Sequence, residues 1–442
     1  MVATSQDSVR MSSKKKTAAP KENGKSTLIP KLRFPEFRDA EGWKETAINM
    51  IANPVTKRAI QGEEDNILSL STEYGIVLQS EFFGKKVAGD NSERYLKIAR
   101  NDFVYNDRTT KASTFGTIKR LSKHSGGIVS PIYKCFRFNV EENPVFWEWY
   151  FESGGHTKAL AGLVNEGARA GRFNISITQF LSTHALRPDK AEQQKIAECL
   201  SSLNELIAAQ TRKVDALKSH KTALIQQLFP REGETQPRFR LPEFQRKGKW
   251  RVRFLGEIAS FASGGTPSKE IPTYWNGSIP WVSASSMYDL TIYKAIHYVT
   301  PLAIGNGTRI AQKGSILILV RGSMLFKRVP ICVAGVDVAF NQDVKALNIE
   351  SSINTLFLLY ELLAFQSRFP INETGIGAGK IELDHLKEFE LFIPDSLEQQ
   401  RIADCLSNLD VIINAEIRKI ESLKLHKRGL TQQLFPTQEE AL

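Results

Sequence analysis

Apolar residues recur at alternating spacings of four and three along two long stretches of the chain. In the first stretch the series is Ile196, Leu200, Leu203, Ile207, Val214, Leu217, Leu224 and Leu228, with polar members Gln210 and Lys221. In the second it is Ile402, Leu406, Leu409, Ile413, Ile420, Leu423, Leu430 and Leu434, with polar members Glu416 and Lys427. A seam of this period, sustained over ten positions, predicts two coiled-coil helices. The alternative is two unrelated core helices that share a pattern through duplication.

Both helices are expected to begin in the same way. Asp189 with Glu192, and Asp395 with Glu398, fit an Asp-x-x-Glu capping box directly after a proline. The polar members of the seam then favour an antiparallel arrangement. A parallel pair in register would bury Lys221 against Lys427, and bringing two desolvated ammonium groups together is costly.

An antiparallel pair can bring opposite or neutral partners together instead. The register we predict pairs Lys221 with Glu416 and Gln210 with Lys427, and leaves every other layer apolar. A helix of 39 residues spans roughly 58 Å. Two such helices would therefore hold two globular domains apart, related by a pseudo-twofold axis.

The helices belong to a duplication that covers most of the chain. Residues Glu192–Pro230 and Glu398–Pro436 match at 23 of 39 positions, and LRFPEF at Leu32–Phe37 returns as FRLPEF at Phe239–Phe244. NDFVYNDR and KGSILILVR each read as a buried strand that ends in an arginine, while GGIVSPIYKCF and VAFNQDVKALNI form a second equivalent region. Short β-rich runs with occasional helices, such as INTLFLLYELLAF, predict an α+β fold.

The predicted order has five parts. A disordered basic tail covers residues 1–27, a β-rich domain 28–188, a spacer helix 189–230, a second β-rich domain 231–394 and a C-terminal spacer helix 395–442.

Composition narrows the class of partner. The net charge of +11 suggests a polyanionic partner. The longest apolar stretch, TLFLLYELLAF, carries Glu361 and is too short to span a bilayer, and no signal peptide is evident, so a cytoplasmic location without membrane contact is expected. Four separated cysteines and seven scattered histidines predict neither a disulfide framework nor a metal site.

The order of these motifs resembles the specificity subunit of type I restriction–modification systems. In the second half the resemblance rests on LGEIASFASGGTPSKEIPTYWNGSIPWVSASSM, KGSILILVRGS and VAFNQDV. In the first half it rests on YLKIARNDFVYNDR and GGIVSPIYKCF, and at the helix starts on RPDKAEQQKIA and IPDSLEQQRIA. The basic extension before Leu28 departs from the family pattern.

The resemblance implies that each β-rich domain is a target-recognition domain. Each domain would read one half of a bipartite, asymmetric site in double-stranded DNA. The helices would set the spacer and dock two modification subunits, with restriction subunits joining outside. S-adenosylmethionine, ATP and Mg would be used by those partners, so this chain is expected to hold no cofactor and to be no enzyme by itself.

Base readout on this view comes from basic and amide side chains on surface loops. The candidates are Arg108, Lys111, Arg169, Arg172 and Asn174 in the first domain, and Arg321, Lys327, Arg328 and Lys380 in the second. Arg108 and Arg321 rank highest because each follows an apolar strand. The alternative for each is a solvated loop charge or a structural ion pair.

Two motifs raise the alternative of an enzyme. NPVF at Asn143–Phe146 is similar to the Asn-Pro-Pro-Phe tetrad of adenine methyltransferases, but a strand-end turn is the favoured interpretation. GIGAGKI at Gly375–Ile381 is similar to a phosphate loop, but Thr374 and Ile381 stand where glycine and Ser/Thr are required, so a flexible, DNA-facing basic loop is favoured. The open alternatives are a stand-alone DNA adenine methyltransferase with a fused recognition domain and a coiled-coil adaptor without a DNA role.

Overall fold

The computed structural model describes residues 27–60, 66–83, 92–109, 113–163, 174–374 and 377–436. Nearly all of the predicted basic tail lies outside these ranges. The chain divides into two units: unit 1 comprises residues 1–208 and 421–442, and unit 2 comprises residues 209–420. Each unit therefore takes its globular part from one repeat and a helical segment from the other.

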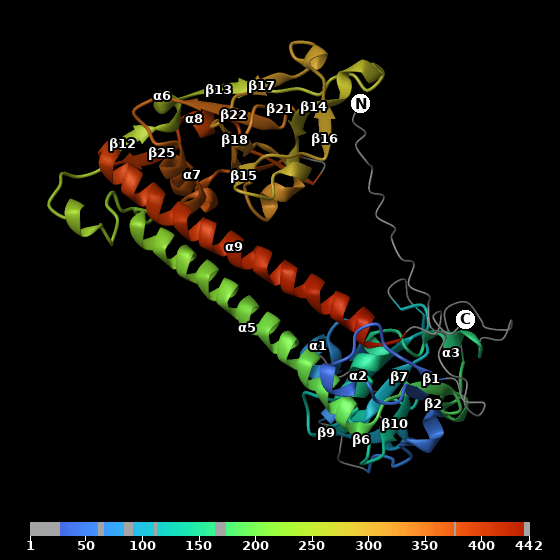
Figure 1. The fold of residues 1–442 in the computed structure, drawn as a ribbon. Helices are drawn as coiled ribbons and strands as arrows, with labels where there is room; N and C mark the ends of the chain where they lie inside the picture. Colours follow the sequence, from blue (N-terminus) through green and yellow to red (C-terminus); the bar gives the residue numbers. More distant parts are fainter. Residues whose placement is uncertain are drawn as a thin grey trace, which may run out of the picture. The chain divides into compact units, whose positions relative to one another are not determined.

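Unit 1 contains two four-stranded sheets and a small three-stranded sheet, drawn in Figure 1. Their orders are β3-β10-β7-β8, β5-β4-β9-β6 and β1-β2-β11. The strands are β1 (Thr27–Leu28), β2 (Trp43–Ala47), β3 (Ala52–Pro54), β4 (Ile67–Ser71), β5 (Gly75–Leu78), β6 (Leu96–Ala99), β7 (Phe103–Asn106), β8 (Thr117–Arg120), β9 (Gly126–Val129), β10 (Lys134–Phe138) and β11 (His184–Arg187). The short helices are η1 (Pro35–Phe37), η2 (Ile48–Met50), α1 (Gln79–Phe83), η4 (Ser92–Arg94), α2 (Pro144–Glu152), α3 (Thr157–Ala161) and α4 (Ile177–Leu181).

Unit 2 repeats this plan with additional strands. Its corresponding sheets have the orders β13-β22-β18-β20-β15, β16-β14-β21-β17 and β12-β25, and a further sheet has the order β19-β24-β23. The strands are β12 (Arg251–Phe254), β13 (Ala259–Ser263), β14 (Trp275–Val282), β15 (Thr291–Ile292), β16 (His297–Val299), β17 (Arg309–Ala311), β18 (Ile316–Leu319), β19 (Arg321–Gly322), β20 (Ile331–Ala334), β21 (Val338–Phe340), β22 (Val344–Ile349), β23 (Asn372–Thr374), β24 (Ala378–Lys380) and β25 (Glu390–Ile393). The short helices are η5 (Pro242–Phe244), α6 (Leu255–Ile258), η6 (Pro272–Tyr274), η7 (Ala284–Ser286), η8 (Pro301–Ala303), η9 (Ser323–Phe326), α7 (Thr355–Ala364), η10 (Gln366–Arg368) and α8 (Leu383–Lys387).

The two units have equivalent strand pairings. β10 pairs antiparallel with β7 as β22 pairs with β18, and β4 pairs parallel with β9 as β14 pairs with β21. The strands before Arg108 and Arg321 therefore occupy equivalent central positions, which confirms the internal repeat and the α+β class.

A cluster of three aromatic rings lies in each core. In unit 1 Trp43 contacts Phe146 of α2 and Phe435, with ring centres 5.6 and 6.0 Å away. In unit 2 Trp250 contacts Phe357 of α7 at 5.9 Å and Phe229 at 6.3 Å. Phe435 and Phe229 directly follow the long helices, so the end of each helix is packed into the core of the unit that it enters.

The long helices are α5 (Lys190–Leu228) and α9 (Ser396–Leu434), each of 39 residues. In unit 1 the first half of α5 lies beside the end of α9, where Lys427 donates to Asn204 at 3.0 Å. In unit 2 the end of α5 lies beside the first half of α9, where Lys221 contacts Asp410 at 2.6 Å. Early residues of one helix meet late residues of the other in both units, which confirms the antiparallel coiled coil.

The predicted register is wrong. Lys221 pairs with Asp410 instead of Glu416, Gln210 donates to Glu416, and Lys427 pairs with Asn204. The prediction paired each seam residue of one helix only with a seam residue of the other helix. Asn204 and Asp410 each stand one position after a seam leucine, and from there their side chains reach the lysine of the other helix.

The helix starts differ in part from a capping box. Asp189 and Asp395 accept the backbone N–H of Glu192 and Glu398 at 2.8 and 2.9 Å, as predicted. The two glutamate carboxylates instead bind arginines from far along the chain. Arg33 donates to both Glu192 oxygens at 2.8 and 2.7 Å, and Arg240 donates to both Glu398 oxygens at 2.7 and 2.6 Å.

Candidate nucleic-acid interface

Strand β18 positions Arg321 at the surface of unit 2. All four residues of β18 are buried between β22 and β20. Val320 is also buried, and its N–H donates to the carbonyl of Asp343 while its carbonyl accepts from Ile381. The next residue, Arg321, is exposed. A buried strand therefore fixes the backbone at this point and leaves the guanidinium in solvent.

Lys380 lies beside Arg321 on the neighbouring strand. Arg321 and Lys380 are directly paired in the antiparallel register of β19 and β24. The Lys380 ammonium lies 2.7 Å from the carboxylate of Glu382, so its charge is partly compensated. The expectation of a flexible loop here is wrong for residues 378–380, which form a strand; Gly375 and Ile376 lie outside the described residues. A Cβ on Gly379 would lie 2.7 Å from the Ile371 side chain, so this strand requires glycine there.

Lys327 and Arg328 follow η9 and are both exposed. The helix is anchored by Leu325, which is buried, and begins after Gly322, whose φ is 145°. Arg328 donates to the carbonyl of Met287 at 2.9 Å, and its guanidinium lies 5.9 Å from the centre of the Tyr288 ring. Unit 2 thus places its four sequence candidates on two adjoining segments, β19–η9 and β24.

Unit 1 places Arg108 in the equivalent position after β7. Asp107 is buried and forms an ion pair with Lys134 at 2.6 Å, whereas Arg108 is exposed. The Arg108 N–H donates to the side chain of Asn106 at 3.2 Å. Asn174 is exposed with a φ of 55°, and in the repeat it corresponds to Lys380. Lys111, Arg169 and Arg172 lie outside the described residues.

A basic concavity of unit 1 was missed by the sequence analysis. Lys57, Lys97 and Arg137 line a hollow of about 590 Å³, and none of its described lining residues is acidic. Arg137 is held by the buried carboxylate of Asp102 at 2.5 Å, which raises the pKa of Arg137, yet its side chain remains half-exposed. The three cations are 80 positions apart from first to last, so no local pattern could have grouped them.

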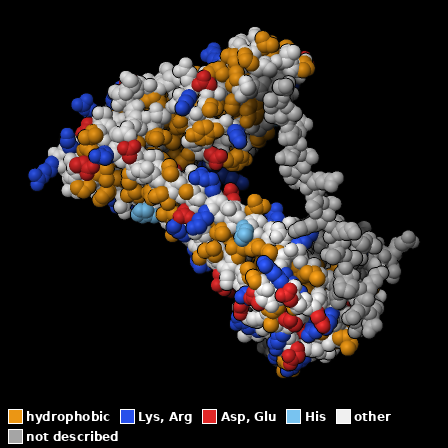
Figure 2. Space-filling view, in the orientation of Figure 1, with side chains coloured by type: hydrophobic (Ala, Val, Ile, Leu, Met, Phe, Trp, Pro, Cys, Tyr) orange, Lys and Arg blue, Asp and Glu red, His pale blue; other side chains and the backbone are white. Residues whose placement is uncertain are grey.

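Basic side chains do not by themselves mark one surface. On the face drawn in Figure 2, they are interspersed with acidic and apolar side chains. The internal repeat identifies candidate DNA-binding residues better than charge does. It places Arg108 and Arg321 after equivalent strands, and Asn174 aligns with Lys380 when the two repeats are superimposed in sequence.

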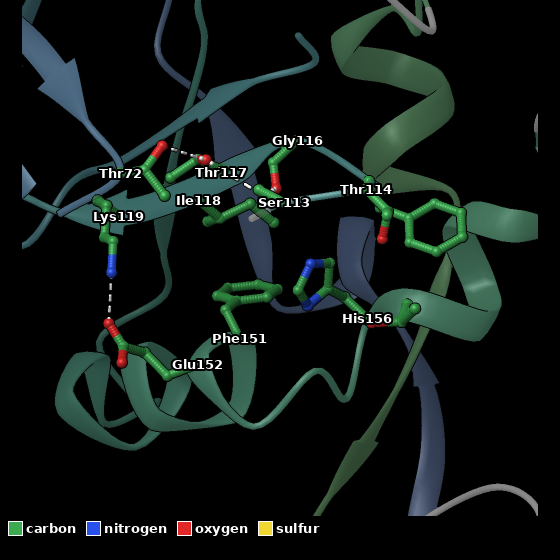
Figure 3. Close-up of a pocket in the computed structure, with 12 residues that line it drawn as sticks. Thr72, Ser113, Thr114, Gly116, Thr117, Ile118, Lys119, Phe151, Glu152 and His156 are labelled. Carbon is green, nitrogen blue, oxygen red and sulfur yellow. Dashed lines mark hydrogen bonds and ion pairs between the residues drawn. The ribbon is translucent and has the colours of Figure 1, made fainter. Parts of the chain in front are cut away.

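A pocket of about 280 Å³ in unit 1 is the strongest candidate for an enzymatic site (Figure 3). His156 and Phe151 lie at its base, and Lys119 binds Glu152 at 2.5 Å. Burial lowers the pKa of His156 to about 4, so the imidazole is neutral near pH 7. Its Nδ1 atom is buried without a hydrogen-bond partner in the described part of the chain. A nucleophile paired with its base requires a hydrogen bond between them, and His156 forms no hydrogen bond with Ser113 or Thr114 in the described part of the chain.

The other enzyme-like motif has a structural role. Asn143 is the N-cap of α2, and its side chain accepts the N–H groups of Val145 and Phe146 at 2.9 and 3.1 Å. Its amide donates to Gln194 on α5. The predicted strand-end turn is therefore a helix N-cap. In unit 2, Asn354 caps α7 and binds Gln400 of α9 in the same way.

The described residues provide neither a metal-binding cluster nor a membrane-spanning helix. They contain no group of three His, Cys, Asp or Glu side chains able to hold a metal ion. Their helices also include none with the length and apolar character needed to cross a membrane.

Comparison with known sequences gives a consistent set of relatives. Residues 247–425 match the family described as the type I restriction modification DNA specificity domain. The specificity subunit of the type I restriction enzyme EcoR124I/EcoR124II from Escherichia coli is 30% identical over 235 residues, which cover 52% of this chain and 54% of that protein. The MjaIX specificity subunit from Methanocaldococcus jannaschii is 28% identical over 184 residues, covering 40% and 41%. The matches thus span about half of these relatives or less.

Solved structures extend the likeness to most of the chain. The type I restriction–modification S subunit from M. genitalium has a TM-score of 0.54 at 15% identity, covering 93% of this chain and 100% of that one. A chain from a structural study of type I restriction–modification complex assembly has a TM-score of 0.55 at 17% identity, covering 89% and 97%. At these identities the likeness concerns the fold.

Proposed function

We propose that this chain is a type I restriction–modification specificity subunit and selects the DNA sequence on which its complex acts. Each β-rich domain would read one half of a bipartite site in double-stranded DNA. The observation that carries the proposal is the equivalence of β7–Arg108 and β18–Arg321: one buried strand in each unit ends in an exposed arginine.

The two halves of the site should differ because the side chains around the arginines differ. Lys380 lies next to Arg321 in unit 2, whereas the corresponding residue in unit 1 is Asn174. Arginine and lysine favour guanine in the major groove, and asparagine favours adenine. Equivalent scaffolds with different side chains at equivalent positions would therefore read different bases.

The long helices would set the spacer and dock the modification subunits. Leu206 and Ile412 occupy equivalent positions of α5 and α9, and both remain exposed, as does Val411. Apolar side chains that stay exposed at equivalent positions of both helices suit two copies of one partner. Restriction subunits would join this assembly from outside.

Catalysis would belong to the partners. We expect S-adenosylmethionine, ATP and Mg to be bound there, because Asn143 is occupied as a helix cap and His156 lacks a nucleophile. A binding assay with S-adenosylmethionine on the purified chain, with the modification subunit as positive control, tests this expectation. Saturable binding by the chain alone would favour the stand-alone methyltransferase.

Methylome sequencing of a host that expresses the chain with its modification subunit tests the function directly. The expected result is a bipartite, asymmetric motif with methylated adenine. Arg321→Ala should relax one half of the motif and Arg108→Ala the other, since one bidentate base contact contributes about 1–3 kcal/mol of discrimination. Arg246→Ala, an exposed arginine before β12, serves as the charge-matched control and should leave the motif unchanged. A single continuous motif, or an unaltered motif in both test variants, would refute the proposal.

A further inference from the structure

The sheet β1-β2-β11 of unit 1 and the sheet β12-β25 of unit 2 are equivalent, but they differ in their number of strands. In unit 1 the sheet has three strands, and β1 pairs antiparallel with the outer edge of β2, where Leu28 lies opposite Trp43. In the described part of unit 2 the equivalent sheet consists of β12 and β25. Among the described residues, no strand pairs with the outer edge of β12. The residues of unit 2 that correspond to Thr27 and Leu28 are Glu234 and Thr235, which are not in a strand.

Hydrogen bonding identifies the free backbone groups of β12. Leu255 donates to the carbonyl of Phe389, which continues the ladder with β25 and assigns Arg251 and Arg253 to the same, inward-bonded set. Trp250, Val252 and Phe254 therefore direct their backbone groups outward. The N–H of Trp250 donates to the side chain of Gln236 at 3.2 Å, and that of Phe254 to Glu257 at 3.1 Å. Val252 lies between these two capped positions, and its outward N–H and carbonyl have no hydrogen-bond partner within the ranges that the structure describes.

The opposite edge of this sheet is closed. The N–H of Phe392 in β25 donates to the carboxylate of Glu361 at 2.6 Å, and Glu361 is fully buried in α7. Unit 1 closes the corresponding edge with Tyr150, whose hydroxyl accepts from Leu186. The sheet of unit 2 thus has one sealed edge and one open edge.

The side chains of β12 are unusual for an edge without a partner. Val252 is 47% exposed and Phe254 is 42% exposed. On the other face of the strand, Arg251 and Arg253 line a pocket of about 440 Å³ together with Lys247 and Lys249. Neither Lys249 nor Arg251 forms an ion pair with a described residue. Natural edge strands are usually covered or blocked, so an open edge with apolar residues on one face is typical of a pairing site.

The same position in unit 1 has no such excess of charge. Lys44 is the counterpart of Arg251, and it forms an exposed ion pair with Glu41 at 2.7 Å. Its backbone lies opposite Thr27 of β1. Unit 1 therefore compensates the charge and covers the edge within its own chain. In unit 2, Arg253 pairs with Glu257 and Lys247 with Asp395, but the charge of Arg251 and the edge of β12 are left without such a partner among the described residues.

We propose that the open edge of β12 binds an extended segment of a partner protein chain, in which acidic residues alternate with apolar ones. The segment adds a strand to the β12–β25 sheet, antiparallel to β12 as β1 is to β2. Its backbone bonds to Val252, its apolar side chains cover Val252 and Phe254, and its carboxylates enter the pocket beside Lys249 and Arg251. Phosphates of nucleic acid could use the cations but not the strand edge or the apolar face, which is why a peptide is favoured.

The test uses the purified full chain and a blocked hexapeptide of alternating glutamate and valine. Controls are a lysine–valine counterpart and two versions of the first peptide with backbone N-methyl groups on alternate residues. The acidic peptide should bind and slow exchange of the Val252 amide at least about tenfold. The lysine peptide should not bind, and one of the two methylated versions should lose binding because only one edge of the peptide faces β12.

Variants of the chain separate pairing from simple charge attraction. Arg251→Glu should weaken peptide binding at least about tenfold, whereas the matched change Lys44→Glu in unit 1 should not. Val252→Pro removes the outward N–H of an edge strand without breaking the ladder with β25; it should abolish binding and leave unfolding unchanged. Binding that depends on charge but survives both methylated peptides and Val252→Pro would overturn the proposal. So would absence of peptide binding, a Val252 amide already protected in the chain alone, or protection by duplex DNA in place of the peptide.

Discussion

The contact between Lys221 and Asp410 gives the sharpest test of how α5 and α9 fit together. Lys221 donates to both Asp410 oxygens at 2.6 Å, and its ammonium lies 4.9 Å from the centre of the Tyr360 ring. The Tyr360 hydroxyl donates to Asp410 at 2.6 Å. The Lys221 side chain is 12% exposed and that of Asp410 is 21% exposed. Solvent therefore screens this pair much less than a surface pair.

The expected coupling follows from this geometry. Unit charges about 3 Å apart attract by roughly 5 kcal/mol at an effective dielectric constant near 20, and removing both ions from water offsets much of that gain. A double-mutant cycle of Lys221→Met and Asp410→Asn should give a coupling energy of about 1–3 kcal/mol, in the upper part of the roughly 0.5–3 kcal/mol found for residues in one hydrogen-bonded network. Asparagine is a conservative choice because Asn204 holds the equivalent position in unit 1.

Hydrogen exchange of the α5 segment around Lys221, followed by mass spectrometry, is the suitable assay because it reports local opening in a chain of two units. The cycle of Lys221→Met with Glu416→Gln is the matched control. Glu416 binds Gln210 and Lys213 in the structure, so this second cycle should show no measurable coupling. A larger coupling for Glu416 than for Asp410 would refute the observed register and restore the one predicted from the seam.

Two further predictions concern unit 1. Arg33→Met should destabilise unit 1 by about 3–5 kcal/mol in urea unfolding, because it leaves the carboxylate of Glu192, 1% exposed, buried without its cation; Arg238→Met, which breaks an exposed pair, should have no measurable effect. The second prediction concerns His156, because burial lowers its pKa from 6.5 to about 4. Between these pH values the unfolded state binds a proton at this residue and the folded state does not, so stability is lost as pH falls from 6.5 toward 4. The loss should reach about 3 kcal/mol, and His156→Gln should remove this share of the acid sensitivity; equal pH profiles for the two proteins would contradict the assignment.

Periodicity predicted the long-range plan of this chain because that plan is repeated and local in sequence. The ten-position seam predicted both long helices, and the duplicated motifs predicted two equivalent domains. The cost of burying like charges against each other excluded a parallel pair. The buried strands before Arg108 and Arg321 could be predicted for the same reason, because the apolar runs FVY and ILILV are local patterns.

Contacts between residues far apart in the chain could not be predicted from local patterns. Glu192 matched a local capping box, but its carboxylate is used by Arg33, 159 positions earlier. Arg33 and Arg240 recur within LRFPEF and FRLPEF, so the repeat held a signal that the helix pattern alone could not supply. Lys57, Lys97 and Arg137 have no such repeated context, and only the folded sheets bring them to one hollow.

The buried lysines show how far two copies of one scaffold can diverge. Lys221 and Lys427 occupy equivalent positions, and each lies 4.9 Å from an aromatic ring centre, Tyr360 in unit 2 and Trp149 in unit 1. In unit 2 the partner is the carboxylate of Asp410, which also accepts the Tyr360 hydroxyl. In unit 1 the partner is the neutral Asn204, and burial lowers the pKa of Lys427. An aspartate thus accompanies a ring that donates to it, and an asparagine accompanies a ring that does not, so two equivalent lysines have different partners within the same antiparallel pairing.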